Sequence, residues 1–141
     1  MLDNQIISVK EILELEPSNQ KIEVKGWIRN KRGSKKTSFL SINDGSTIKT
    51  LQVIAEDQVI NEATLKDITT GCCVQINGVL KKSIGANQQS ELFAEKIKIL
   101  GLADPNEYPL QPKKHSLEFL REKAHLRFRT NTFSAVFRIR H

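Results

Sequence analysis

A short stretch of this sequence combines several positive charges with one aromatic side chain. Five basic residues fall within eight positions with no acidic residue among them: Arg29, Lys31, Arg32, Lys35 and Lys36. Phe39 follows three positions later. Such charges attract phosphates and a base can stack on an exposed ring, so the combination is typical of a surface that binds single-stranded nucleic acid. A run of charges is also typical of a plain solvated loop, so the interpretation depends on where the chain places Phe39.

Two polar residues further along the chain have the chemistry to recognise a base. Gln52 carries a carboxamide with one acceptor and two donors, which matches a base edge that offers both, such as N3–H and a carbonyl of uracil. Glu91 can accept a hydrogen bond from a base amine. Both residue types are also common on ordinary surfaces, so their roles depend on the strands that carry them.

The sequence shows no pattern that predicts catalysis. Its three histidines, His115, His125 and His141, are scattered near the end of the chain, and no glycine-rich phosphate loop or paired acidic residues are evident. We therefore predict no catalytic residue, no metal site and no cofactor in this chain.

Composition narrows the class of protein further. The 141 residues are 38% hydrophobic and carry a formal net charge of +6, enough apolar material for one core and a charge that permits an anionic partner. No stretch approaches the ~20 apolar residues that span a bilayer, and the first residues lack the layout of a signal peptide. The two cysteines, Cys72 and Cys73, are neighbours without metal-ligand spacing, which favours a reducing, cytoplasmic setting.

The pattern of apolar residues changes along the chain and predicts the elements that position these side chains. A capping-box sequence at Ser8 to Glu11 predicts a short helix over about 8–16. Period-two alternation then predicts strands over about 21–29, 39–42, 50–55, 74–81 and 91–100, with a short helix capped by Asp57 between the third and fourth. This order is typical of an all-β, five-stranded Greek-key barrel of the oligonucleotide/oligosaccharide-binding (OB) type. An SH3-like barrel is the alternative, and the helix before the fourth strand favours the OB type.

The same alternation assigns the outer face of the barrel. If Leu40 and Val53 point into the core, Phe39 and Gln52 must point outward on neighbouring strands. The basic run then lies at the end of the first strand and in the following loop, at the edge of the face that OB domains use for binding. The alternative is that Phe39 packs under a loop or against the N-terminal helix.

The last 41 residues differ from the rest. Three of the four prolines fall between Gly101 and Lys114, and residues 101–141 carry 8 basic and 4 acidic residues against 14 and 12 before them. We therefore predict a boundary near residue 102, with the barrel in 1–102 and a linker with a helical tail in 103–141. Helices are expected over 116–126 and after Thr132, with apolar faces that lack a partner within this chain.

Three stretches of the chain resemble class II aminoacyl-tRNA synthetases of the Asp/Asn/Lys group, and within it the asparaginyl branch. They are Val24–Arg32 (VKGWIRNKR), the hairpin of Phe39–Ser46 with Leu51–Val53, and the most specific stretch, Tyr108–Arg127 continuing into Arg129–Phe133. The resemblance implies an anticodon-binding OB domain in 1–102, followed by the hinge and a truncated start of a catalytic domain in 103–141.

The resemblance also implies a partner and a set of roles. The anticodon loop of tRNA(Asn) would bind the barrel, with Phe39 stacked on the central uridine, Gln52 at the edge of that base, Arg32 close by and Glu91 at the third base. Arg29 and Lys31 belong to the same basic run and are expected beside them. The full-length ligase would use ATP and Mg²⁺ and form a homodimer, whereas this chain stops before the catalytic motifs and is expected to be inactive alone. The alternatives are a free-standing single-stranded nucleic-acid-binding protein and a protein-interaction module built on the same barrel.

Overall fold

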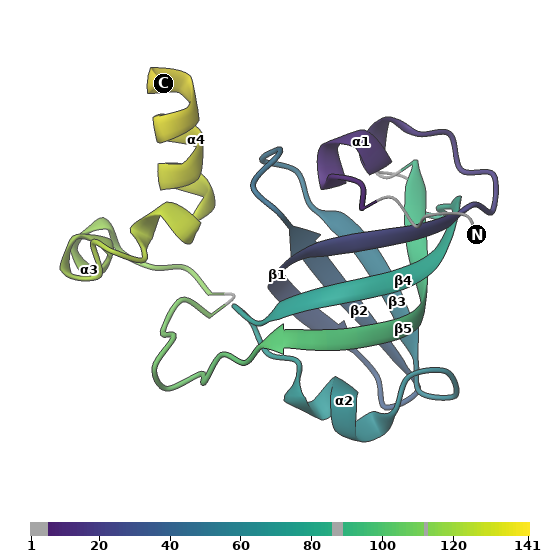
Figure 1. Ribbon diagram of the computed structural model, residues 1–141. Helices are drawn as coiled ribbons and strands as arrows, with labels where there is room; N and C mark the ends of the chain where they lie inside the picture. The colour runs from purple at the N-terminus through teal and green to yellow at the C-terminus, as the bar shows by residue number, and fades with distance from the viewer. Residues whose placement is uncertain (1–5, 86–88, 112) are drawn as a thin grey trace.

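Five strands form a closed barrel in the computed structural model, which describes residues 6–85, 89–111 and 113–141 (Figure 1). The strands are β1 (Lys21–Gly33), β2 (Thr37–Asn43), β3 (Leu51–Glu56), β4 (Cys73–Lys82) and β5 (Ser90–Gly101). They are hydrogen-bonded in the order β1-β2-β3-β5-β4, with β3 and β5 parallel and the other pairs antiparallel. This confirms the predicted five-stranded OB-type barrel with short helices.

The long strand β1 closes the barrel because it pairs with two different neighbours. Its first half pairs with β4 and its second half with β2. At Gly26, between the two halves, a Cβ atom would come within 2.7 Å of the Ile42 Cγ2 atom and 2.9 Å of the Asn43 carbonyl oxygen. Only glycine therefore allows this close approach of the backbones.

A register shift in β1 determines which of its residues face outward. Between Ile28 and Asn30 the pairing with β2 slips, so that Ile28 lies opposite Ile42 and Asn30 opposite Ser41. The extra residue reverses the in–out alternation of everything that follows it. As a result Lys31 lies opposite the buried Leu40, and Arg32 lies opposite Phe39.

The interior of the barrel is filled by the alternating apolar residues that the sequence pattern indicated. The largest of the fully buried side chains in the strands are aliphatic: Val24, Ile28, Leu40, Ile42, Leu51, Val53, Ile76, Leu80 and Leu92. Burial of each such side chain contributes about 1.5–3 kcal/mol to folding. The core therefore holds the strands in one register, and the register fixes the positions of the outward-facing residues.

Two short helices lie on opposite sides of the barrel, α1 (Val9–Glu14) and α2 (Glu62–Asp67). The capping box predicted at Ser8 is present, since Ser8 Oγ accepts from the backbone N–H of Glu11 and the Glu11 carboxylate accepts from the backbone N–H of Ser8. Asp44 holds the start of α1 by accepting from the Val9 N–H at 2.9 Å. The start predicted for the other helix was wrong: Asn61, not Asp57, is the N-cap, because its side chain accepts from the Ala63 N–H.

The tail leaves the barrel at Gly101 and forms α3 (Leu117–Glu122), the 3-10 turn η1 (Arg127–Arg129) and α4 (Asn131–Arg140). Ser116 is the N-cap of α3, so this helix starts where expected, but it ends at Glu122 and not at the predicted residue 126. The final helix begins two residues earlier than predicted, after Thr130. Figure 1 shows α3 and α4 to one side of the barrel, and large apolar side chains on α4, Val136, Phe137 and Ile139, are exposed. Within the described residues no helix is long and apolar enough to cross a membrane.

Candidate nucleic-acid interface

One row of cross-strand partners forms an apolar strip on the outside of the barrel. Arg32 pairs with Phe39, Phe39 with Ile54, and Ile54 with Phe93, so the row crosses β1, β2, β3 and β5. The guanidinium carbon of Arg32 lies 5.9 Å from the centroid of the Phe39 ring. Phe39 on β2 and Phe93 on β5 remain partly exposed, while Ile54 on β3, which pairs with both, is buried. The expected pairing of an outward aromatic with a basic side chain is thus present.

A second row, two residues along the strands, carries polar side chains. Asn30 pairs with Ser41, and Ser41 with Gln52. The Gln52 Nε2 atom lies 3.5 Å from the Glu91 Oε1 atom, which also accepts from the Ser83 hydroxyl at 2.8 Å. Glu91 is only 8% exposed, and these two donors hold its carboxylate in place. A carboxylate only accepts, and the contact therefore turns the amide nitrogen of Gln52 toward Glu91.

Lys31 does not join these rows. It lies on the inner side of β1, opposite Leu40, and its ammonium group donates to the carbonyl oxygens of Leu65 and Ile68, at the end of α2. Burial lowers the pKa of Lys31. The side chain therefore holds the end of α2 against the barrel instead of lying beside Phe39.

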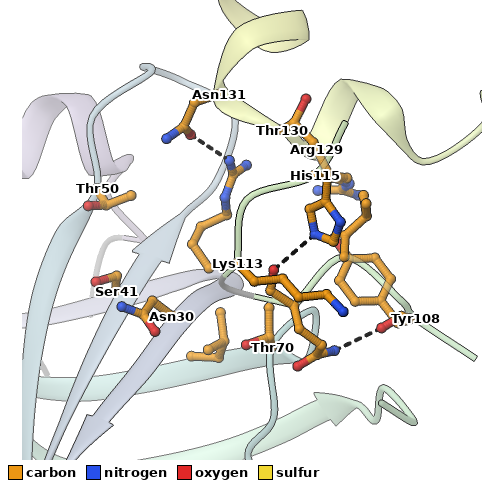
Figure 2. A pocket seen from close by; sticks show the side chains of 14 residues that line it. Asn30, Ser41, Thr50, Thr70, Tyr108, Lys113, His115, Arg129, Thr130 and Asn131 are labelled. Atoms are coloured by element: carbon orange, nitrogen blue, oxygen red, sulfur yellow. Dashed lines mark hydrogen bonds between the residues drawn. The ribbon is translucent and has the colours of Figure 1, made fainter. Parts of the chain in front are cut away.

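Arg29 is also separated from the apolar strip, because it sits at the register shift and turns toward the tail. Its Nη2 atom donates to Asn131 Oδ1 at 2.9 Å (Figure 2). Burial lowers the pKa of Arg29, the nearby Tyr108 opposes that shift, and the charge of Arg129 adds to it. The Arg129 guanidinium in turn lies 4.6 Å from the centroid of the Trp27 ring. Barrel and tail are thus joined by arginine contacts.

A cavity of about 370 Å³ lies at this junction (Figure 2). Among the described residues, its lining includes three cationic side chains, one histidine and no acidic side chain: Arg29, Lys113, Arg129 and His115 are joined by Ile28, Asn30, Ser41, Thr50, Thr70, Tyr108, Leu110, Gln111, Thr130 and Asn131. Asn30 and Ser41 belong to the same row as Gln52, so the cavity is continuous with the polar row on the barrel. Its electrostatic character suits an anion.

Of the six residues expected to bind nucleic acid, the structure brings four together on one face: Arg32, Phe39, Gln52 and Glu91. Sequence reasoning did not assign Phe93 to this outer face, where the Lys81 ammonium nitrogen lies 4.7 Å from the Phe93 ring centroid. Leu92, Phe93 and Ala94 form an uninterrupted apolar run, which hides the alternation that would have assigned Phe93 to the outside. No group of three or more His, Cys, Asp and Glu side chains that could hold a metal ion was found among the residues described.

The barrel is closed and five-stranded, a helix lies between β3 and β4, and the outer face carries aromatic and basic side chains. These features define an OB-type nucleic-acid-binding domain. Comparison with known proteins agrees. The family model described as "OB-fold nucleic acid binding domain" matches residues 22–100, and the chain belongs to this family.

Similar proteins extend the likeness beyond the barrel. The chain is 53% identical over 133 residues to the asparagine–tRNA ligase of Bacteroides fragilis, covering 94% of this chain and 28% of that protein. It is 50% identical over 137 residues to the asparagine–tRNA ligase of Cytophaga hutchinsonii, covering 96% and 30%. The chain thus spans less than a third of the length of these relatives.

Solved structures show the same fold. Asparaginyl-tRNA synthetase from Pyrococcus horikoshii superimposes with a TM-score of 0.78 at 24% identity, over 96% of this chain and 32% of that one. Aspartyl-tRNA synthetase from Entamoeba histolytica gives a TM-score of 0.75 at 17% identity, over 98% and 35%. At these identities the likeness concerns the fold alone.

Proposed function

We propose that this chain is the anticodon-binding region of an asparagine–tRNA ligase and binds the anticodon loop of tRNA(Asn). The observation that carries the proposal is the joint placement of Phe39, Gln52 and Glu91 on one face of the barrel, beside Arg32. The identity of about 50% to asparagine–tRNA ligases along most of the chain supports it.

The middle uridine of the anticodon stacks on Phe39 in this proposal, with Arg32 close to its phosphate. The amide of Gln52 then faces the Watson–Crick edge of the base, because Gln52 lies on β3 two residues from Ile54, the cross-strand partner of Phe39. Because Glu91 orients that amide, its oxygen and nitrogen have fixed places, and a base edge is recognised by the order of its donor and acceptor. Uracil presents the donor N3–H beside an acceptor carbonyl, so the amide oxygen of Gln52 can accept from N3–H while its nitrogen donates to the carbonyl.

The cavity beside Arg29 gives the same strand a place for its backbone. An RNA chain that leaves the polar row passes Asn30 and Ser41 and reaches three cationic side chains, without meeting an acid among the described residues that line the cavity. We assign Arg29 to a phosphate contact there. Lys31 supports α2, and we assign it no contact with RNA.

Residues 103–141 are, in this proposal, the hinge and the start of the catalytic domain, so the exposed apolar residues of α4 pack against the rest of the ligase. The complete enzyme joins asparagine to tRNA with ATP and Mg²⁺ in the cytoplasm, and acts as a homodimer.

The first test is the affinity of the 141-residue chain for a fluorescein-labelled anticodon stem-loop, followed by fluorescence anisotropy at several salt concentrations. Phe39→Ala should weaken binding about 5- to 150-fold, the loss expected for one stacked base. Phe137→Ala, which removes an exposed ring from α4, is the control and should leave the affinity unchanged. Absence of salt-dependent binding would contradict the proposal and favour a protein-interaction module.

The second test concerns specificity. Stem-loops with uridine or cytidine at the middle position should differ in affinity for the unmodified chain, and Gln52→Ala should remove most of that difference. Gln58→Ala is the control, because Gln58 is an exposed amide in the turn before α2. Equal affinity of the unmodified chain for all single-stranded sequences would instead indicate a general single-stranded nucleic-acid-binding protein.

A further inference from the structure

Phe93 occupies a position on β5 that repeats the surroundings of Phe39. Ile54 pairs with Phe39 on one side and with Phe93 on the other, so the two rings share one row with a single strand between them. Two strand spacings separate them by about 10 Å. Both rings are partly exposed and both have a cation over them, Arg32 in one case and Lys81 in the other.

The resemblance extends to the polar row. Gln52 precedes Ile54 by two residues on β3, and Glu91 precedes Phe93 by two residues on β5, which pairs with β3 in parallel. The ring, cation and hydrogen-bonding side chain therefore occur twice: Phe39, Arg32 and Gln52 form the first set, and Phe93, Lys81 and Glu91 form the second. The hydrogen bond between Gln52 and Glu91 joins the two sets.

We propose that Phe93 is a second stacking platform, on which a base adjacent in the RNA to the one on Phe39 lies with its edge toward Glu91. This inference rests on the proposed function, since it assumes that a single strand crosses this face. Bases that are splayed apart along a strand stack on separate aromatic side chains in this way. An edge with N–H donors suits Glu91, whose carboxylate only accepts.

Lys81 occupies the face of the Phe93 ring in the absence of RNA. Its ammonium nitrogen lies 4.7 Å from the ring centroid, within the range of a cation–π contact. An arriving base displaces the ammonium group from the ring, and the flexible, exposed side chain then reaches the phosphate of the same nucleotide. Lys81 thus covers the ring when no base is bound and contributes one phosphate contact when a base takes its place.

The substitution that tests this platform is Phe93→Leu, which keeps an apolar side chain beside Ile54 and removes the flat ring. Affinity for the anticodon stem-loop should fall about tenfold, within the range for loss of a stacked base, and Phe93→Trp should restore it. Phe133→Leu is the matched control, because Phe133 is also partly exposed with a guanidinium 5.2 Å from its ring, that of Arg127, but lies on α4. Equal affinities for Phe93→Leu and Phe133→Leu would refute the platform.

Stem-loops with single abasic positions then locate the base. Removing the base that Phe93 holds should abolish the effect of Phe93→Leu and preserve that of Phe39→Leu, whereas removing the middle base should do the reverse. Loss of binding in Phe39→Leu without an effect of Phe93→Leu overturns this inference but leaves the proposed function intact; no binding by the unmodified chain overturns the proposed function itself.

The exchange of Lys81 has a separate signature in the salt dependence. The slope of log affinity against log salt is negative, and Lys81→Gln should make it less steep by about 0.7, the value for one phosphate on a single strand. A slope equal to that of the unmodified chain would show that Lys81 stays on the ring, which contradicts its proposed displacement by a base.

Discussion

The contact between Gly71 and Tyr108 is the clearest test of how the tail sits on the barrel. Gly71 has a φ of +93°, and a Cβ atom there would lie 2.8 and 2.9 Å from the Cδ1 and Cε1 atoms of the Tyr108 ring. Gly71→Ala therefore has two costs, a strained backbone and a displaced ring. Gly45 separates them, because its φ is +86° and nothing lies within 4 Å of its Cβ position.

The expected magnitudes follow from these two costs. A side chain at positive φ costs about 1–2 kcal/mol, which is the whole effect expected of Gly45→Ala. Tyr108 is only partly buried, so loss of its packing adds about 1 kcal/mol, roughly half the value for full burial of a large side chain. Gly71→Ala should therefore lower the free energy of unfolding by about 2–3 kcal/mol.

Urea unfolding followed by the fluorescence of Trp27, the single tryptophan, measures these differences. In a Tyr108→Ala background the ring is absent, and Gly71→Ala should then cost no more than Gly45→Ala. The double-mutant cycle should give a coupling of about 1 kcal/mol between Gly71 and Tyr108. Equal costs for Gly71→Ala and Gly45→Ala in the unmodified chain would refute the packing of Tyr108 on the barrel.

Three further changes test single side chains. Lys31→Met removes the hydrogen bonds to the end of α2 and should lower the free energy of unfolding in urea by about 1 kcal/mol. It should leave the affinity for the anticodon stem-loop unchanged, whereas Arg32→Gln should weaken that affinity. Glu91→Gln should shrink the preference for uridine over cytidine, measured by anisotropy, because Gln52 loses its fixed orientation; an unchanged preference would contradict this. Burial alone would raise the pKa of Asp44, but hydrogen bonds from Ser46 and Val9 lower it overall. Ionised Asp44 therefore stabilises the fold above about pH 4, and the gap in unfolding free energy between the unmodified chain and Asp44→Asn should close as the pH falls through the lowered pKa, whereas a constant gap would contradict the assignment.

The strands were predictable from the sequence because one face of each is buried in a single core. Alternation around Leu40 and Val53 assigned Phe39 and Gln52 to the outside, and the register of β2 and β3 agrees. The start of α2 was not predictable, since Asp57 and Asn61 are both good N-cap residues and only packing selects between them. Phe93 was missed because its neighbours are apolar too, and local pattern cannot show which of three adjacent apolar residues faces outward.

The division of the basic run depends on the one feature of β1 that a sequence pattern cannot contain. Continued without interruption from Ile28, the alternation would direct Arg29 and Lys31 outward together and Arg32 into the barrel. The register shift between Ile28 and Asn30 exchanges them, so that Arg32 meets Phe39 and Lys31 reaches the carbonyl groups at the end of α2. Three of the five charges thus lie in three different places, Arg32 beside the Phe39 ring, Lys31 at the end of α2 and Arg29 in the cavity between barrel and tail. Net charge permits an anionic partner, but one additional residue in a strand selects which cation stands beside the Phe39 ring.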